Sequence, residues 1–413
     1  MSHPHHGSGH AAPIYTPKGL INLKLGPRKP LRHMGPITEI PEDGRVVVDM
    51  GPSHPAMHGT VKMRTILDGE TVERIDVDVG YLHRGFEKSS EAVTWTQVFP
   101  YTDRLNYISP FLNNVAYAMA VEKLMGIEVP ERAEYLRVIS GEISRMADHC
   151  TCVGAATMEL AAFTGMLYLI EARDILWDLT EELCGARLTV AYCRVGGVVE
   201  DLPEGFEGRV QKAMDKINVL LDDADTLLTK NQIFIGRMKG VGKMTKEDAI
   251  DWGWTGPCLR STGVPYDVRL AHPYSIYNRL DFAVPVGENG DNYDRYLVRL
   301  TELRESQKMI MQCLKQIKDT PPAIMVDDAR VKIPPKQKTH TAIEELMNHF
   351  KLIIDGVQVP AGEAYAYIEG ANGELGFYLV SNGSGKPWKI RVRPPCWPIT
   401  SSLPVLLEGG MLA

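Results

Sequence analysis

The feature that most constrains the fold is a long central region in which apolar residues recur every three or four positions. This spacing is typical of amphipathic helices, and it covers residues 115–125, 133–146, 208–228 and 294–315. The stretch from Cys150 to Ile170 carries a single charge, Glu159, and is long enough to span a bilayer. Its Gly, Ala and Thr content makes it only weakly hydrophobic, so we expect a fully buried helix inside a soluble bundle. The pattern therefore predicts a helix bundle over residues 106–320.

Strand patterns flank this bundle on both sides. Before it, β-like runs cover 45–50, 62–67 and 71–79, and Asp68-Gly69 is typical of a hairpin turn between the last two runs. After it, the runs 364–369 and 376–380 are joined by a second expected turn at 371–373. We therefore expect an α+β fold in one unit over 43–413, with an N-terminal antiparallel β region at 43–80 and a strand-rich part at 321–413.

The N-terminal residues have a composition that does not build a core. Residues 1–38 contain five Lys or Arg and five His, no Asp or Glu, and Pro and Gly throughout. We expect residues 1–42 to form a flexible basic arm that contacts partner subunits.

Composition excludes several classes of function. The net charge of -7 argues against a protein that works by coating nucleic acid. The seven cysteines are odd in number and scattered, and the closely spaced Cys150 and Cys152 have no second pair to complete a metal site. We expect buried, reduced thiols and no metal or iron–sulfur cluster bound by this chain alone. The sequence also lacks a Walker loop and a Rossmann glycine motif, so we expect no NAD or flavin site.

Polar residues gather in two loops. The loop 51–59 presents His54 and His58 around Pro55, and three interpretations are open: a histidine tied to the backbone, a hydrogen-bond donor and proton carrier, or a metal ligand. The segment 82–88 includes Arg84, and its default interpretation is a solvated charge cluster.

Two further candidates lie in the helical region. Glu142, Arg145 and His149 fall on one helix face, where they could form a buried ion-pair network or take part in catalysis. Glu159 stands alone in an apolar stretch, so burial should raise its pKa and make it a candidate for proton handling.

Several motifs taken together resemble a known family. The chain resembles the D-type subunits of proton-pumping NADH:quinone oxidoreductase, respiratory complex I, and the resemblance covers nearly the full length after the arm. The matching segments are Gly-Pro-Ser-His-Pro-Ala-Met-His-Gly at 51–59, Gly-Tyr-Leu-His-Arg-Gly-Phe-Glu-Lys at 80–88, Asp-Arg-Leu-Asn-Tyr at 103–107, and the segments 137–145, 290–296 and 378–383. The resemblance implies a fold like that of the large subunits of nickel-iron hydrogenases.

The resemblance also implies the site and the partners. It places a quinone pocket where this chain meets the B-type subunit, whose terminal iron–sulfur cluster supplies electrons, with subunits C, H and I as further partners. His58 and Tyr107 match the ligands of the quinone headgroup, and Glu159 matches the acidic partner of that histidine. His54, Arg84, Arg145 and His149 match positions at the pocket or at the cluster interface. The implied location is peripheral, on the cytoplasmic face of the bacterial plasma membrane.

Two alternatives remain open beside this interpretation. The first is a nickel-containing hydrogenase. In the related membrane hydrogenases two thiolates occupy the positions of Asn106 and Ser109, and an amide and a hydroxyl are poor ligands for nickel. A non-catalytic scaffold subunit is the other alternative. Family members also carry, after the position of Ala413, an acidic segment that helps to line the quinone cavity, and this sequence ends before it.

Overall fold

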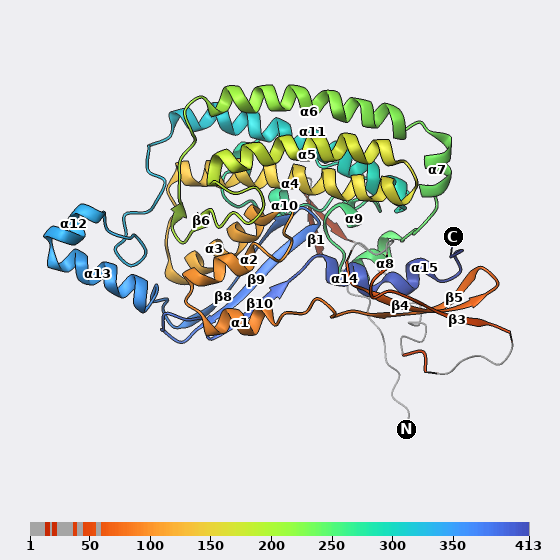
Figure 1. Ribbon diagram of the computed structural model, residues 1–413, viewed down its shortest axis with the longest axis horizontal. Coiled ribbons are helices and arrows are strands. Elements are labelled where there is room, and N and C mark those ends of the chain that lie inside the picture. The colour runs from red at the N-terminus through yellow and green to blue at the C-terminus, as the bar shows by residue number, and fades with distance from the viewer. Residues whose placement is uncertain (1–12, 17–18, 23–35, 39–43, 55–58, 413) are drawn as a thin grey trace.

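The computed structural model describes residues 13–16, 19–22, 36–38, 44–54 and 59–412. A layer of long helices covers small antiparallel sheets, and this arrangement confirms the predicted α+β class (Figure 1). None of the described helices is both long and apolar enough to cross a membrane.

The predicted helix bundle is present at the centre of the chain. Its long helices are α3 (Pro110–Met125), α4 (Glu131–Glu159), α5 (Phe163–Cys184), α6 (Phe206–Leu228) and α11 (Asn292–Gln316). Helix α4 packs against both α5 and α11, and α5 packs against α6. Most side chains of α4 from Ala133 to Cys150 are buried, because neighbouring elements cover the helix on several faces. Helix α4 is therefore the central element that positions polar side chains inside the molecule.

The segment from Cys150 to Ile170 is not one buried helix, so that prediction was wrong. Helix α4 ends at Glu159, and α5 begins at Phe163. Ala161, in the turn between them, has a φ of 62°, a left-handed conformation that a non-glycine residue rarely adopts. The turn carries Glu159 to the exposed end of α4, and its expected burial is wrong as well.

The sheet before the bundle follows the predicted hairpin. Strands β3 (Val46–Met50), β4 (Lys62–Asp68) and β5 (Thr71–Asp78) pair antiparallel in that order. Asp68 pairs with Thr71 across the turn, as expected.

The last sheet contains the second predicted hairpin and one further strand. Strands β8 (Gly362–Gly370) and β9 (Gly373–Ser381) are joined by Ala371 and Asn372, and β10 (Lys389–Arg393) pairs with the other edge of β9. Strand β8 packs directly on α3. The β8–β9 turn thus comes to lie beneath the helix bundle (Figure 1).

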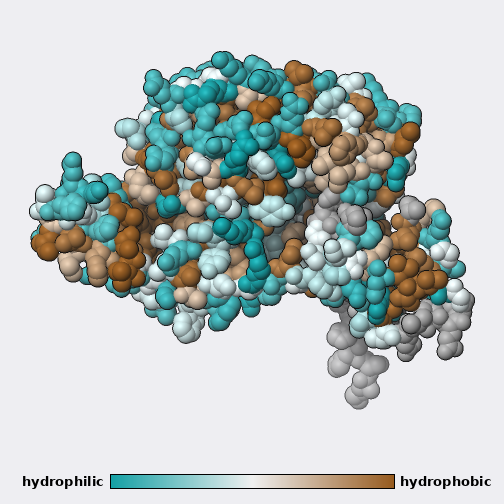
Figure 2. Space-filling view, viewed as in Figure 1, coloured by the Kyte–Doolittle hydropathy of each residue, from teal (hydrophilic) through white to brown (hydrophobic). Residues whose placement is uncertain are grey.

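The region 321–413 contains the expected strands, β8, β9 and β10, together with helices that the sequence patterns did not predict. These helices are α12 (Lys336–Thr341), α13 (Ile343–Ile354), α14 (Cys396–Ser401) and α15 (Leu403–Leu407). Helices α12 and α13 project from the body of the molecule, at the left of Figure 1. No residue of α13 is buried, and apolar side chains gather on the lower face of this projection in Figure 2.

Short elements complete the described chain. Two small hairpins are formed by β1 (Pro13–Thr16) with β2 (Gly19–Asn22) and by β6 (Cys193–Arg194) with β7 (Gly197–Val198). The short helices are α1 (Phe86–Ala92), α2 (Phe99–Thr102), α7 (Gln232–Met238), α8 (Lys246–Asp251), α9 (Gly256–Arg260) and α10 (Val268–Ala271). The β1–β2 hairpin and residues 36–38 are the described parts of the expected basic arm, whose contact with partner subunits stays a prediction.

Candidate functional site

Tyr107 lies on a short loop between α2 and α3. Its side chain is 56% exposed. Within the described part of the chain, its phenol has no hydrogen-bond partner. A phenol on a protein surface that is not used internally can donate to, or accept from, a bound molecule.

The loop that carries Tyr107 is nevertheless held firmly. The backbone carbonyl of Asn106 accepts from the Ser109 N–H at 3.1 Å and from Asn113 Nδ2 at 2.9 Å. The Asn106 side chain donates to Ser109 Oγ at 2.7 Å and to Asp148 Oδ2, on α4, at 2.5 Å. The residues beside the phenol are therefore fixed by internal hydrogen bonds while the phenol is left available.

A cavity of about 360 Å³ opens beside this loop. Its walls come from the loop and the start of α3, from the β8–β9 turn, and from the segment between β10 and α14. The lining residues are Leu105, Asn106, Ser109, Leu112, Asn113, Gly370, Ala371, Asn372, Leu375, Val392, Pro394, Pro395 and Cys396. The lining is mostly apolar with a few amide and hydroxyl groups, which is the usual character of a site for a small organic ligand.

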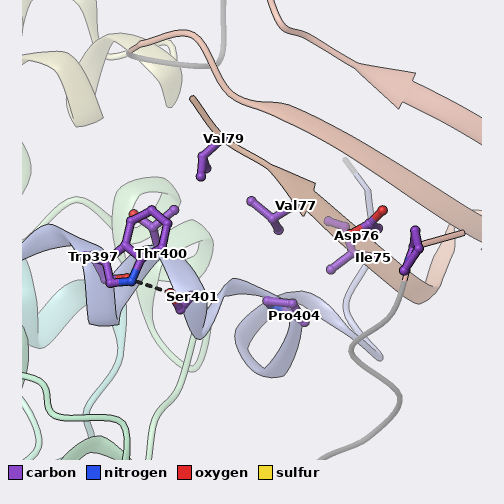
Figure 3. A pocket seen from close by; sticks show the side chains of 9 residues that line it. Ile75, Asp76, Val77, Val79, Trp397, Thr400, Ser401 and Pro404 are labelled. Carbon is purple, nitrogen blue, oxygen red and sulfur yellow. Dashed lines mark hydrogen bonds between the residues drawn. The ribbon is translucent and has the colours of Figure 1, made fainter. Parts of the chain in front are cut away.

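A second cleft also borders α14. It has a volume of about 280 Å³, and Figure 3 shows Trp397 and Thr400 of α14 on one side and Val77 and Val79 on the other. Ser401 donates to the Trp397 carbonyl at 2.9 Å, so that hydroxyl is already used within the helix. Asp76 is the one ionisable side chain among the described residues that line this cleft. Because Cys396 lines the first cavity, α14 forms a wall shared by both.

Arg145 belongs to a buried ionic network, as one of the two sequence interpretations predicted. Glu142 accepts from Arg145 Nε at 3.1 Å, from Tyr277 Oη at 2.7 Å and from Ser306 Oγ at 2.7 Å. Arg269 forms a second ion pair with Glu142 at 3.3 Å. The two Nη atoms of Arg145 donate to the carbonyls of residues 369 and 370, which ties α4 to the end of β8.

His149 joins the same network at Glu302 of α11. His149 Nε2 lies 2.7 Å from Glu302 Oε2, while Arg260 donates twice to Glu302 Oε1 at 2.7 and 2.9 Å. Burial would raise the pKa of Glu302, but the Arg260 charge and the His149 hydrogen bond outweigh it and hold this pKa below its ordinary value. Burial lowers the pKa of His149 in spite of Glu302, so we assign a neutral ring that donates from Nε2. In the described part of the chain, its Nδ1 has no hydrogen-bond partner.

The other predicted site residues that the structure describes lie apart from this network. His54 and Arg84 are exposed on loops that adjoin the β3–β5 sheet, and His58 lies outside the described residues. Glu159 ends α4 eleven residues after Asp148, about 16 Å further along the helix axis. The structure thus joins Arg145 and His149 in one network inside the core. The Tyr107 loop is bonded to α4 at Asp148, whereas Glu159 is the last residue of α4.

The charge cluster expected at 82–88 divides into two parts. His83, Arg84 and Lys88 are exposed, as a solvated cluster requires. Glu87 instead accepts from Arg391 Nη1 at 2.5 Å and from the Val392 N–H at 3.1 Å, which attaches α1 to β10.

The cysteines are free thiols. Cys150, Cys193, Cys258 and Cys313 are buried, as predicted, whereas Cys396 is exposed. Among the described residues no group of three or more His, Cys, Asp or Glu side chains could hold a metal ion.

Several polar residues that build the site were not predicted from the sequence. Asp148 of α4 bonds to the cavity loop at Asn106 and to Asn372 of the β8–β9 turn, and Arg260 and Glu302 complete the pairing of His149. Asp148 directly precedes the predicted His149, and a charged residue within an otherwise buried helix was an available signal. The other residues come from distant segments that carry no such signal.

Comparison with known proteins identifies the family. The family described as "Respiratory-chain NADH dehydrogenase, 49 Kd subunit" matches residues 159–413. The chain is 51% identical over 407 residues to a D-type subunit, designated D 1, of the NADH-quinone oxidoreductase of Anaeromyxobacter dehalogenans, and the match covers 98% of this chain and 91% of that relative. It is 54% identical over 371 residues to the D-type subunit of Myxococcus xanthus, with 89% of this chain and 88% of the relative covered.

A third relative has a longer chain. An NADH-quinone oxidoreductase subunit of the C/D type from Bdellovibrio bacteriovorus is 47% identical over 375 residues, which cover 91% of this chain and 67% of that relative. Identity at this level over nearly the whole length confirms the resemblance seen in the motifs. The chain therefore belongs to the family of 49-kDa, or D-type, subunits of NADH-quinone oxidoreductase, and it is a subunit of an oxidoreductase complex.

Proposed function

We propose that this chain supplies one side of the pocket in which NADH-quinone oxidoreductase reduces quinone, with the B-type subunit supplying the other side and the electrons. The observation that carries this proposal is the Tyr107 phenol. It is exposed and without a partner in the described residues, on a loop otherwise fixed by hydrogen bonds, beside a mostly apolar cavity. A quinone headgroup is flat and largely apolar, with two carbonyl oxygens that need hydrogen-bond donors, so it matches this combination.

The reaction defines what the residues must do. One quinone takes up two electrons and two protons and becomes one quinol, so negative charge develops on its carbonyl oxygens before the protons arrive. A donor placed at such an oxygen stabilises that charge. We propose that the Tyr107 phenol donates to one carbonyl and the His58 imidazole to the other, where the imidazole can also transfer a proton.

Glu159 acts in this proposal through His58. A carboxylate near an imidazole selects the tautomer and favours the protonated ring. The support for this pairing is the family motif. We also propose that His54 and Arg84, both exposed, lie at the pocket or at the interface with the cluster-bearing subunit. Arg145 and His149 act from within the core by fixing α4.

We further propose that subunits B, C, H and I are the neighbours of this chain, at the cytoplasmic face of the bacterial plasma membrane. The C/D name of the relative from Bdellovibrio bacteriovorus supports the C-type neighbour, because one polypeptide carries both letters there. The chain itself holds no nickel and no iron–sulfur cluster in this proposal. Asn106 and Ser109, at the hydrogenase thiolate positions, are hydrogen-bonded to each other instead. Stoichiometric nickel in the purified subunit would restore the hydrogenase alternative.

The test removes one oxygen atom. Tyr107→Phe should assemble normally and slow quinone reduction by about 30- to 1,000-fold, equivalent to roughly 2–4 kcal/mol of lost transition-state stabilisation. Tyr101→Phe is the matched control, because Tyr101 is a second exposed tyrosine, on α2 six residues before Tyr107. His58→Ala should also impair turnover, and Glu159→Gln should shift its pH dependence.

The rates are compared in the assembled complex with quinone and with an artificial acceptor that takes electrons before the quinone site. A selective loss with quinone supports the pocket. If Tyr107→Phe and His58→Ala both keep parental quinone kinetics at equal assembly, the pocket is elsewhere and the scaffold alternative gains.

A further inference from the structure

One carboxylate connects two walls of the cavity. Asp148 lies in the buried part of α4 with 4% of its surface exposed. Its Oδ2 accepts from Asn106 Nδ2 at 2.5 Å, and its Oδ1 accepts from Asn372 Nδ2 at 3.3 Å. Asn106 belongs to the Tyr107 loop and Asn372 to the β8–β9 turn, and both line the cavity. Asp148 thus joins two segments that are far apart in the sequence.

The chemistry of these bonds sets the orientation of both amides. A carboxylate accepts hydrogen bonds and an amide group has one donating end and one accepting end, so each asparagine must turn its NH₂ toward Asp148. Asn106 Nδ2 also donates to Ser109, which uses its second hydrogen. The carbonyl oxygens of both amides therefore point away from Asp148, and in the described part of the chain the hydrogen bonds of both amides all run through Nδ2.

The cavity consequently offers acceptor oxygens beside the loop that carries Tyr107. An oxidised quinone has only acceptor oxygens and gains nothing from an amide carbonyl. A quinol has two hydroxyl groups, which can donate to such a carbonyl. The orientation of the amides therefore distinguishes the reduced from the oxidised headgroup.

We propose that Asp148 is a positioning residue that holds the Asn106 and Asn372 amides with their oxygens toward the ligand, so that the cavity binds the reduced, hydroxyl-bearing form of the headgroup. This inference rests on the proposed function of the cavity, but it concerns product binding rather than electron transfer. Asp148 touches no ligand itself. It acts by excluding the flipped orientation of each amide, which would set a carbonyl oxygen against the carboxylate and leave both groups without a donor.

The experiment compares quinol inhibition with quinone affinity. Asp148→Asn keeps the shape of the side chain but gives residue 148 one donating end, so whichever facing amide meets its NH₂ must flip and lose its acceptor orientation. In the assembled complex we expect the inhibition constant for added quinol to rise roughly three- to tenfold relative to KM for quinone, the effect of one lost hydrogen bond. Asp222→Asn, on the exposed surface of α6, is the matched control. A purely structural role would lower kcat and assembly but leave this ratio unchanged.

Two further variants make the test decisive. Asn106→Asp combined with Asp148→Asn reverses the donor and the acceptor, restores the bond and returns an acceptor oxygen to position 106, so the ratio should recover. Asn372→Ala removes one acceptor at a hairpin turn without altering α4, and it should raise the ratio by itself if Asp148→Asn fails to assemble.

An unchanged ratio in both Asp148→Asn and Asn372→Ala would overturn the inference. The result for Asp148→Asn is independent of the result for the proposed headgroup ligand Tyr107. If Tyr107→Phe has no effect while Asp148→Asn changes the ratio, the assignment of Tyr107 fails and the role of Asp148 stands.

Discussion

Replacing Arg260 by Met should destabilise the fold more than any surface charge removal. Arg260 is fully buried, and its guanidinium donates twice to Glu302 Oε1 and once each to Glu369 Oε1, at 2.8 Å, and to the Tyr266 carbonyl, at 3.0 Å. It also lies 3.4 Å from Asp267 Oδ2. Methionine fills much of the same space without the charge, so the substitution tests the ionic contacts rather than the packing.

The expected magnitude follows from what the substitution leaves behind. Three buried carboxylates lose a common counter-charge, and Glu302 keeps His149, whose ring we assign as neutral. Breaking a buried ion pair on one side typically costs about 3–5 kcal/mol, a large part of the roughly 5–15 kcal/mol that stabilises an ordinary domain. Arg304→Met is the control, because Arg304 pairs with Asp222 at 2.8 Å in an exposed position where such pairs contribute at most about 1 kcal/mol.

The pH dependence gives the prediction a sign. In the parent the pKa of Glu302 is held below its ordinary value, so its contribution is present above the unfolded pKa and is lost as pH falls through the folded pKa. Without Arg260, burial should raise the pKa of Glu302. Protonation then removes the unpaired buried charge of the variant at a pH where Glu302 of the parent is still ionised. The difference in the free energy of unfolding between the parent and Arg260→Met should therefore be large at pH 7 and shrink toward pH 4. Guanidinium unfolding of the purified full chain measures it at both pH values. If Arg260→Met costs no more than Arg304→Met at pH 7, the network does not stabilise the fold as described.

Two other predictions concern single groups. Burial raises the pKa of Asp103 to about 6, although hydrogen bonds from Asn114 and from the Ala191 N–H act in the opposite direction. The folded state therefore favours the neutral carboxyl. The parent should lose about 1–2 kcal/mol of stability relative to Asp103→Asn as pH rises from 4 to 6, and parallel unfolding curves across that range would contradict this. Burial raises the pKa of the Cys150 and Cys193 thiols to about 12 and raises that of Cys396 as well, but Cys396 is the one exposed thiol in the described part of the chain, so iodoacetamide at pH 8 should modify it first. Mass spectrometry of the native chain reads this out, and equal labelling of Cys150 and Cys396 would refute it.

The sequence predicted those parts of the fold that have a local cause. The spacing of apolar residues located α3, α6 and α11, and Asp68-Gly69 located the β4–β5 turn. The break after Glu159 has no such cause, because Leu160, Ala161 and Ala162 are ordinary helix formers and the left-handed turn at Ala161 depends on the packing of α5 against α4.

The candidate site was predictable only in part, because it is assembled from separate segments. Glu142, Arg145 and His149 share a helix face, and the spacing of Arg145 and Glu142 predicted their ion pair. Their other partners come from α9, α11 and β8, and a single sequence taken by itself does not reveal that these elements meet. Tyr107 came from the family motif, while the cavity beside it depends on a β8–β9 turn that lies more than 260 residues further along the chain.

The face of α13 affects how the free subunit behaves in solution. Ile343, Leu346, Met347, Phe350, Ile353 and Ile354 are between 46% and 65% exposed, and together they form an apolar ridge on a projecting helix. A ridge of this kind in water promotes self-association that increases with protein concentration. The isolated chain is therefore prone to aggregate even when it is correctly folded. Its yield as a monodisperse sample should depend on how soon after synthesis this ridge is covered, and less on the stability of its core.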